Sequence, residues 1–571
     1  MKTLKLLGYA FFAISLFLTS CSKEDDPIVP TPSPEVTKSE ITIDSKLIQN
    51  GLSFSNEKGE QSIDFSTNEN WTLSITNTIS DESWCTASST NGSKGSVSVK
   101  FSVAENTNQE NRSVSVTIKC GTVTKTFIIS QEGADVLMDD IPYLSFKADA
   151  KQTFILSKAV ETLEYSVNNG EWGTLGTSTV TFGGSYGELR LRGKSKTGTS
   201  VITDGDFNEN YSNIKFENSV SVTCTGDIRT LVDYEIYKTV DTSNARFYKL
   251  FNNCNNLISA PDLPATTLAE SCYVSMFEGC TSLTSAPELP ATTLASNCYE
   301  AMFSYCESLT TAPKLPATTL ANNCYKNMFY RCISLTSASE LPATTLAGDC
   351  YSQMFYECSS LISAPELPAT ILASNCYQAM FYGCTSLTSA PKLPATTLAS
   401  DCYQTMFKAC ISLVSAPELP ATTLASNCYQ GMFSSCTSLE IAPELPATIL
   451  TEGCYGSMFS ATSLKTAPEL PATTLAKGCY SSMFSYCTSL TSAPKLPAST
   501  LTDYCYYRMF SNCSNLTYIT MLATDTNADS CLLDWLNGVS SKGTFIKDKK
   551  MTPPYNFDIP RLWTIENYGE E

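Results

Sequence analysis

The stretch CYVSMFEGCTSLTSAPELPATTLASN (Cys272–Asn297) decides the fold of this chain, because it returns with few changes eleven times between Arg246 and Cys531. Its phenylalanine, Phe277, marks a period of 26 residues, which holds until a one-residue deletion before Leu464 shifts the phase. The other phenylalanines of this column are Phe251, Phe303, Phe329, Phe355, Phe381, Phe407, Phe433, Phe459, Phe484 and Phe510. Self-similarity at a period of about 20 to 50 residues is typical of a solenoid.

A single repeat unit cannot be stable alone. Each unit holds about six sizeable apolar side chains, whose full burial contributes roughly 10 to 18 kcal/mol. Fixing the backbone costs about 1 to 2 kcal/mol for each residue, which outweighs that gain over a unit of this length. The units must therefore stack as rungs, so that each buries its apolar side chains against two neighbours.

Two short elements are expected within each rung. The Tyr273–Cys280 segment carries apolar residues at the spacing of one helical turn, which predicts a short helix. The Leu283–Leu289 segment predicts a short strand. Pro287 and Pro290 restrict the pairing of that strand to very few residues, because proline has no N–H to donate to a ladder.

This pattern of cysteine, Tyr-x-x-Met-Phe and Ala-Pro-x-Leu-Pro-Ala-Thr resembles the BspA-like leucine-rich repeats, over about half of the chain. The resemblance implies a curved leucine-rich-repeat solenoid over residues 246–531, with a short strand and a short helix per rung. Members of that family are mostly bacterial surface proteins linked to adhesion, and the repeat carries no known catalysis. The expected fold is therefore mixed, with all-β sandwich modules before the solenoid.

The N-terminal residues 1–20 are expected to be a secretory signal peptide. Lys2 and Lys5 precede an apolar run from Leu6 to Leu18, which is too short to span a membrane and ends in small residues. The ending Leu-Thr-Ser-Cys resembles a bacterial lipobox, which implies cleavage before Cys21 and lipidation of its thiol. The alternative is an ordinary signal peptide beside an incidental cysteine.

Residues 21–36 are expected to be a tether that is acidic at first and then rich in proline. The acidic cluster resembles the signal that sends some Gram-negative lipoproteins to the outer face of the outer membrane, and the prolines keep the segment stiff and solvated. The expected location is therefore the outer membrane, with a lipid anchor at Cys21 and the protein facing the cell exterior.

Residues 37–133 predict a β-sandwich, because polar and apolar residues alternate in short runs such as Ser96–Phe101. Trp71, Trp84 and the closing Phe127–Gln131 run resemble a BACON domain, whose name implies carbohydrate binding. A tryptophan within a strand more often belongs to the core than to a sugar site, so neither tryptophan is predicted to bind a ligand.

Residues 134–245 predict a second β-rich module, in which Asn168-Asn169-Gly170 supplies a turn with positive φ. Its expected role is to cover the open apolar end of the first rung, because solenoid ends need caps. Residues 532–571 depart from the repeat pattern and are expected to cap the other end.

Charge and composition exclude several classes of function. The net charge is −19 and the basic residues form no cluster, so nucleic acid is not an expected partner. The chain has no histidine, which removes Ser-His-Asp and Cys-His nucleophile pairs and histidine metal sites. No cofactor or metal is expected. Catalysis by paired carboxylates stays open as an alternative.

The cysteines form two columns in the repeats. Eleven occupy the Cys272 position and ten the Cys280 position, and the unit around Phe459 keeps Cys454 but lacks the second cysteine. Two cysteines eight residues apart on a helix lie about 12 Å apart, too far for a disulfide. We therefore favour ladders of buried free thiols over disulfides, although export to an oxidising compartment argues the other way. A zinc array is less favoured, because short cysteine pairs are missing.

Columns that vary between rungs are expected to face solvent. The position after the phenylalanine holds Tyr330, Tyr356 and Tyr382 in three successive rungs, and a mainly acidic column lies between the two prolines. We interpret these stripes as a binding face for an extended glycan or protein, with the three tyrosines as the ligand-binding residues. The alternative is a solvated face without a ligand.

The sequence as a whole predicts a non-catalytic surface lipoprotein. Its expected partners are outer-membrane lipid, through Cys21, and a host or dietary glycan or glycoprotein. A structural spacer without its own ligand is one alternative, and a surface glycan hydrolase that uses carboxylates is the other.

Overall fold

The computed structural model describes residues 38–77, 84–106, 111–132, 142–176, 179–201, 210–551 and 559–569. These residues fall into two compact units, divided between residues 137 and 138. The expected signal peptide, Cys21 and the tether lie outside the described residues. Within the described ranges, no helix is long and apolar enough to cross a membrane.

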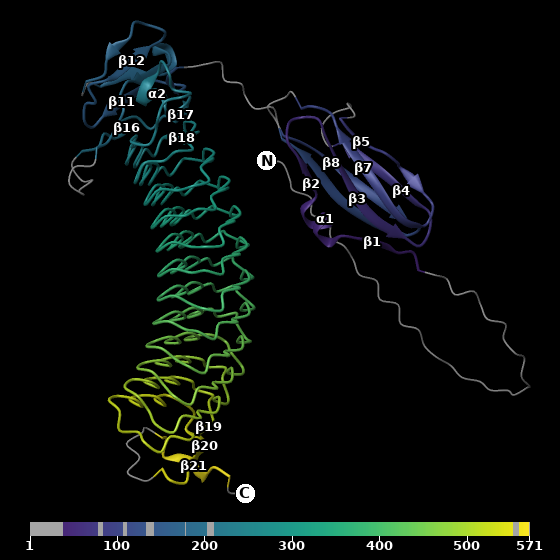
Figure 1. Ribbon diagram of the computed structural model, residues 1–571, viewed down its shortest axis with the longest axis vertical. Coiled ribbons are helices and arrows are strands. Elements are labelled where there is room, and N and C mark those ends of the chain that lie inside the picture. The colour runs from purple at the N-terminus through teal and green to yellow at the C-terminus, as the bar shows by residue number, and fades with distance from the viewer. Residues whose placement is uncertain are drawn as a thin grey trace, which may run out of the picture. The chain divides into compact units, whose positions relative to one another are not determined.

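The first unit is a sandwich of two β-sheets (Figure 1). One sheet has the strand order β1-β3-β7-β5 and the other has the order β2-β9-β8-β4-β6. The bounds are β1 Ile41–Ile43, α1 Ser45–Asn50, β2 Leu52–Phe54, β3 Gly59–Thr67, β4 Trp71–Asn77, β5 Cys85–Ala87, β6 Asn91–Gly92, β7 Gly95–Val103, β8 Arg112–Cys120 and β9 Val123–Gln131.

The sandwich core follows from two-residue alternation. In β7, Val99 and Phe101 are buried while Ser98 is exposed, because successive side chains of a strand point to opposite faces. Trp71 and Trp84 are 2% and 6% exposed and belong to the same core. Their interpretation as core residues is confirmed.

The second unit begins with a β-rich module that joins the solenoid directly. Its sheets have the orders β13-β12-β15-β10-β17-β18 and β14-β11-β16. The bounds are β10 Leu144–Lys147, β11 Gln152–Leu156, β12 Leu163–Val167, β13 Gly173–Thr174, β14 Val180–Phe182, η1 Gly184–Tyr186, β15 Leu189–Gly193, β16 Ile214–Phe216, β17 Val222–Thr225, α2 Thr230–Asp233 and β18 Leu257–Ser259. The predicted turn is confirmed, since Asn168 and Asn169 have φ values of 50° and 60°.

The module covers the open side of the first rung. Strand β17 pairs in parallel with β18, which belongs to that rung. The ring of Phe146 lies 6.3 Å from that of Phe251, and the Cys254 thiol donates to the carbonyl of Ile214 at 2.7 Å. One hydrophobic core therefore runs from the module into the repeats without a break.

The rungs stack in a row between this module and the C-terminal strands (Figure 1). Each rung turns the same residue types inward, mainly cysteine, tyrosine, methionine, phenylalanine and leucine. The phenylalanine rings of successive rungs are nearly parallel, with centroids 5.4 Å apart at Phe251–Phe277 and 5.9 Å apart at Phe459–Phe484. The repeated letters of the sequence therefore form continuous ladders inside the solenoid.

The prediction of a short helix in each rung is wrong. Along Tyr273–Cys280, alternate N–H groups donate to the next rung, as from Tyr273 to the carbonyl of Cys298 at 2.9 Å, while Met276 closes a tight turn onto the Tyr273 carbonyl at 3.1 Å. Ser275 has a φ of 52°, and positive φ recurs at the matching position of later rungs. An α-helix requires negative φ and bonds from residue i to residue i−4. In the described repeats this segment is instead a run of turns bonded along the solenoid axis.

The short strand expected in each rung is found only in part. It forms in the first rung as β18, whereas later rungs of the described repeats pair at the matching position through single parallel bridges, such as Ser337 with Ser363. The last rung has no proline between Leu516 and Cys531, and a four-residue strand, β19 Tyr518–Met521, forms there. Strand β19 pairs in parallel with β20 Lys542–Lys547, which pairs with β21 Leu562–Asn567.

Candidate ligand-binding face

The candidate face lies on the turn segment of each rung, at the position after the inward phenylalanine. Serines in this column are mostly buried, as Ser434 is at 9% exposure, whereas the tyrosine side chains are half-buried and reach the surface. The three predicted tyrosines therefore form the part of the column that extends outward. From the first rung onward the column reads Asn252, Glu278, Ser304, Tyr330, Tyr356, Tyr382, Lys408, Ser434, Ser460, Ser485 and Ser511.

The structure brings the three predicted tyrosines together as one stack. The ring centroids of Tyr330 and Tyr356 lie 4.6 Å apart, and those of Tyr356 and Tyr382 lie 4.4 Å apart, with nearly parallel planes. Tyr305 tilts against Tyr330 at one end of the stack, 5.5 Å away, and the ammonium of Lys408 lies 5.7 Å from the ring of Tyr382 at the other end. The stack with its two flanking residues thus crosses five rungs.

The environment of Tyr330 and Tyr356 keeps their hydroxyls neutral. Burial raises the pKa of Tyr356 to about 12, and the neighbouring Tyr382 adds to that shift. The pKa of Tyr330 is also raised, first by burial and then by Tyr305. Since an ordinary tyrosine already has a pKa near 10, these groups are protonated at neutral pH and can both donate and accept hydrogen bonds.

One ion pair lies beside the stack. The guanidinium of Arg331 is 3.1 Å from the carboxylate of Glu357 and 5.5 Å from the centre of the Tyr305 ring. Together with Lys408, the face therefore combines hydroxyl groups with two positive side chains and one negative side chain, and its net charge is small.

The stack limits what the face can do chemically. Tyr356 has another ring on each side, so its faces are occupied and only the ring edge and the hydroxyl remain for a ligand. Such a surface suits hydrogen bonds to a polar, hydroxyl-rich ligand better than stacking of a sugar on an open ring.

The sandwich offers no open aromatic ring in its described part. Its remaining aromatic residues, Phe54, Phe65, Phe101 and Phe127, are buried together with the two tryptophans. A sugar-binding surface built on ring stacking is therefore missing from the described residues of this unit.

Sequence reasoning missed an aromatic cluster on the β-rich module. The guanidinium of Arg192 lies between the rings of Trp172 and Tyr234, at 3.9 and 4.0 Å from their centres, and is paired with Glu164 at 2.8 Å. No sequence motif announces this cluster, because its members come from separate strands and loops. Its charges are already paired, so it serves packing on the sheet.

The structure places the cysteines of the repeats in two buried ladders. All 24 cysteines of the described ranges are buried and free. In the second column, the thiols donate to the phenylalanine carbonyl of the preceding rung, as Cys306 does to Phe277 at 3.1 Å. Where this cysteine is missing, Thr462 donates instead to the Phe459 carbonyl of its own rung, at 2.8 Å. The column thus supplies side-chain donors to buried carbonyls.

The buried thiols are poor nucleophiles and poor metal ligands in this setting. Burial raises the pKa of the Cys436 thiol to about 12, and the pKa values of Cys410 and Cys358 shift in the same direction. Thiolates are the reactive and metal-binding form of cysteine. Within the described residues, no group of three or more cysteine, aspartate or glutamate side chains could hold a metal ion.

Comparison with known proteins agrees with this architecture. The family described as "BspA type Leucine rich repeat region (6 copies)" matches residues 235–362, 297–440, 348–474 and 403–534, which together span more than half of the chain. The BACON family, described as "Putative binding domain, N-terminal", matches residues 65–132.

Other comparisons are less informative. A solved Bacteroides ovatus GH5 xyloglucanase in complex with an XXXG heptasaccharide is 24% identical over 18% of this chain and 21% of its own, with a TM-score of 0.15. At that TM-score, the likeness supports no argument about this chain. The comparison with curated proteins gave no match. From the extent of the repeat match, the chain belongs to the BspA type leucine rich repeat family and carries a BACON domain before its repeats.

Proposed function

We propose that this protein is a non-catalytic binding protein of the cell surface, anchored by lipid at Cys21 and engaging a glycan or glycoprotein through its tyrosine stack. The two matching families are a binding domain and a repeat, and neither description names a catalytic activity. The observation that carries the proposal is the stack itself, in which Tyr330, Tyr356 and Tyr382 leave the repeat pattern together and reach the surface.

The stack is suited to binding because its hydroxyls are held in a fixed row. Ring stacking removes most of the rotational freedom of each side chain before a ligand arrives, so less entropy is lost on binding. Each hydroxyl offers a hydrogen bond with a net value of about 0.5 to 1.5 kcal/mol. Three of them acting together on one extended ligand account for a change in affinity of about 10-fold or more.

A binding array tests this proposal. The soluble protein from Thr37 onward is applied to glycans and matrix proteins, and the triple variant Tyr330→Ser, Tyr356→Ser, Tyr382→Ser is compared with the parent. We expect the variant to bind the best ligand of the parent at least 10-fold more weakly. A control variant, Tyr486→Ser, removes an exposed tyrosine outside the stack and is expected to bind like the parent.

A second variant separates the hydroxyls from the rings. The triple change of Tyr330, Tyr356 and Tyr382 to phenylalanine keeps the stack and removes the hydrogen bonds, so it is expected to lose binding as the serine variant does. If the serine variant binds as well as the parent, the stack is not the binding face. An array that shows no ligand at all would favour the structural spacer.

The anchor is tested separately. A Cys21→Ala variant removes the thiol that would carry the lipid, so we expect the protein to leave the membrane fraction. Protease treatment of whole cells would then show whether the parent protein is exposed at the cell exterior. Unchanged membrane association of the variant would reject the lipid anchor without affecting the proposal for the tyrosine stack.

A further inference from the structure

The second variable column of the repeats has one run that differs from the rest. Along most of the array, the residue between the two prolines is acidic in two rungs and lysine in the third, with lysines at Lys314, Lys392 and Lys495. Between Lys392 and Lys495, three glutamates follow one another without a lysine: Glu418, Glu444 and Glu469. All three side chains are exposed.

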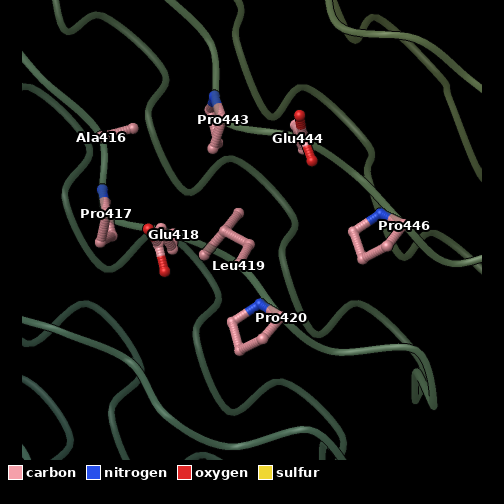
Figure 2. A pocket seen from close by; sticks show the side chains of 8 residues that line it. All are labelled: Ala416, Pro417, Glu418, Leu419, Pro420, Pro443, Glu444 and Pro446. Atoms are coloured by element: carbon pink, nitrogen blue, oxygen red, sulfur yellow. The ribbon is translucent and has the colours of Figure 1, made fainter.

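Two adjoining cavities lie along this run. The first has a volume of about 400 Å³ and lies between the Ala416–Pro420 segment and the next rung, where Pro443, Glu444 and Pro446 complete its lining. Figure 2 shows the Pro-Glu segments of the two rungs, with Leu419 among the lining residues. The second cavity, of about 310 Å³, shares Pro443, Glu444 and Pro446 and reaches the Pro468–Pro471 segment. Together they form one groove across three rungs, called here the proline groove.

The walls of the proline groove combine apolar and polar surface, and the charges of its glutamates are unpaired. Proline, alanine and leucine side chains supply most of the lining. In the part of the chain that the structure describes, none of the three glutamates forms an ion pair. Two lysines of these rungs pair with other acids, since Lys465 pairs with Glu440 at 2.6 Å and Lys477 lies 3.7 Å from Glu452. Lys392 and Lys495 lie in the same column, one rung before and one rung after the run.

The spacing of the carboxylates matches an extended chain. Successive rungs in this region are 5.8 to 5.9 Å apart at their phenylalanine rings. Side chains on one face of an extended strand recur about every 6.6 to 6.8 Å, so a strand lying along the axis places one side chain near each rung. Lysine and arginine can lay their aliphatic stems on apolar walls while the charged head meets a carboxylate.

We propose that the proline groove binds an extended, basic segment of a partner protein, with lysine or arginine at alternate positions facing Glu418, Glu444 and Glu469. The charge is complementary, the proline and leucine side chains of the walls fit the stems, and the rung spacing sets the alternation. This site is separate from the tyrosine stack, and the proposal does not depend on the function proposed above.

Binding of a labelled peptide tests the proposal on the purified full chain. The probe is a fluorescein-labelled peptide with three lysines at alternate positions between serines, and the comparison peptide has the same composition with its three lysines contiguous. Fluorescence anisotropy at low salt is expected to show that the alternating peptide binds at least 5-fold more tightly. Equal binding of the two peptides would overturn the proposed register.

Two matched variants test the residues. The variant Glu418→Gln, Glu444→Gln, Glu469→Gln is expected to bind the alternating peptide at least 10-fold more weakly. The control variant Glu288→Gln, Glu340→Gln, Glu366→Gln removes the same number of charges from the same column and is expected to change binding less than 2-fold. Since all six side chains are exposed, both variants are expected to melt at the temperature of the parent.

Several outcomes would overturn the proposal. Equal losses in the two variants would show attraction by overall negative charge rather than a site. No loss in either variant would remove the glutamates from consideration. Displacement of the peptide by millimolar Ca²⁺, with saturable Ca²⁺ binding that the groove variant abolishes, would assign the glutamates to a cation instead. Tighter binding of a chitosan oligosaccharide than of the peptide would assign the groove to an amino sugar.

Discussion

Two parts of the repeat array have the same interior packing and different surface side chains. The rungs that carry Tyr330, Tyr356 and Tyr382 present an aromatic stack at the surface, whereas the later rungs place serine in the same column, from Ser434 to Ser511. The phenylalanine and tyrosine ladders of the interior continue through both parts. The difference teaches that stacking and ligand recognition use separate columns, so that one can vary while the other is kept.

Alkaline pH is expected to have the largest effect on the stability of the interior that the two parts share. Burial raises the pKa of thiols such as Cys324, Cys376 and Cys436 to about 12 in the folded protein, while unfolded thiols ionise near pH 8.5. The unfolded state therefore loses protons first as the pH rises, so folded stability is full below about pH 8.5 and falls above it. At pH 10, each such thiol lowers the free energy of unfolding by about 2 kcal/mol, and a few of them together offset the whole stability of a typical domain.

We therefore expect the urea midpoint of the repeats to be constant from pH 7 to 8 and to collapse between about pH 9 and 10.5. Circular dichroism at each pH measures this. A parallel titration of the denatured protein should count about 24 free thiols, which are the 25 cysteines of the sequence without Cys21. A midpoint unchanged at pH 10, with few free thiols, would mean that the ladders are oxidised.

The next effect compares the two parts directly. Phe355 and Phe433 are both fully buried, and each is stacked between two phenylalanines, one among the tyrosine-bearing rungs and one among the serine-bearing rungs. Replacing either by alanine is expected to cost about 3 to 5 kcal/mol. Chemical denaturation should give losses that agree within about 1 kcal/mol, since the two sites are packed alike. A larger difference would break the equivalence of the two interiors.

A smaller effect concerns the thiol donors. The Cys410 thiol donates to the Phe381 carbonyl at 3.0 Å, so Cys410→Ala leaves that carbonyl with only its backbone donor, the N–H of Cys384 at 3.2 Å. The expected cost is about 1 kcal/mol in denaturant unfolding. Cys410→Ser keeps a side-chain donor and is the control, which should cost less than the alanine variant. Equal losses of stability in the two variants would indicate that the cysteines of this column only fill space.

The smallest effect sharpens the boundary between the two surfaces. Lys408 stands beside Tyr382 at the end of the stack, so Lys408→Tyr should add one ring and stabilise the array by about 0.5 kcal/mol. Ser460→Tyr adds a tyrosine without an aromatic neighbour in its column and should give no gain. The two urea midpoints compare them. A gain at both positions would show that ring burial, rather than stacking, stabilises the column.

The sequence was sufficient for the solenoid and for the direction of most side chains. Period and column identity indicate that Phe277 and Leu283 pack inward, and two-residue alternation indicates that Trp71 and Trp84 belong to a sandwich core. These predictions succeed because burial of apolar side chains is the main energetic term and leaves a periodic trace in the sequence.

The conformation of the turn segment could not be read in the same way. The spacing of Tyr273, Met276 and Phe277 along the sequence fits a helix as well as it fits this run of turns. The positions that match Ser275 have positive φ but hold several residue types in different rungs, with glycine only at Gly431, so no consistent glycine signal marks them. Only the bonds between neighbouring rungs decide the conformation, and a single rung does not contain them.

The sequence predicted that the three tyrosines share one column, but it did not predict that their rings stack. Sequence shows that Tyr330, Tyr356 and Tyr382 recur at one position, but the ring planes depend on how a partly buried column packs against itself. The Arg192 cluster left no trace in the sequence at all, because its aromatic neighbours are distant along the chain.

The alternate N–H groups of the turn segments also have a consequence for how this protein can change in length. Each rung donates to one neighbour and accepts from the other with the same pattern, as in the pairs Tyr273 to Cys298 and Tyr299 to Cys324. A gene that gains or loses one whole 26-residue unit therefore joins two surfaces that already match. Duplication can lengthen the array while the module at one end and β19–β21 at the other remain as they are.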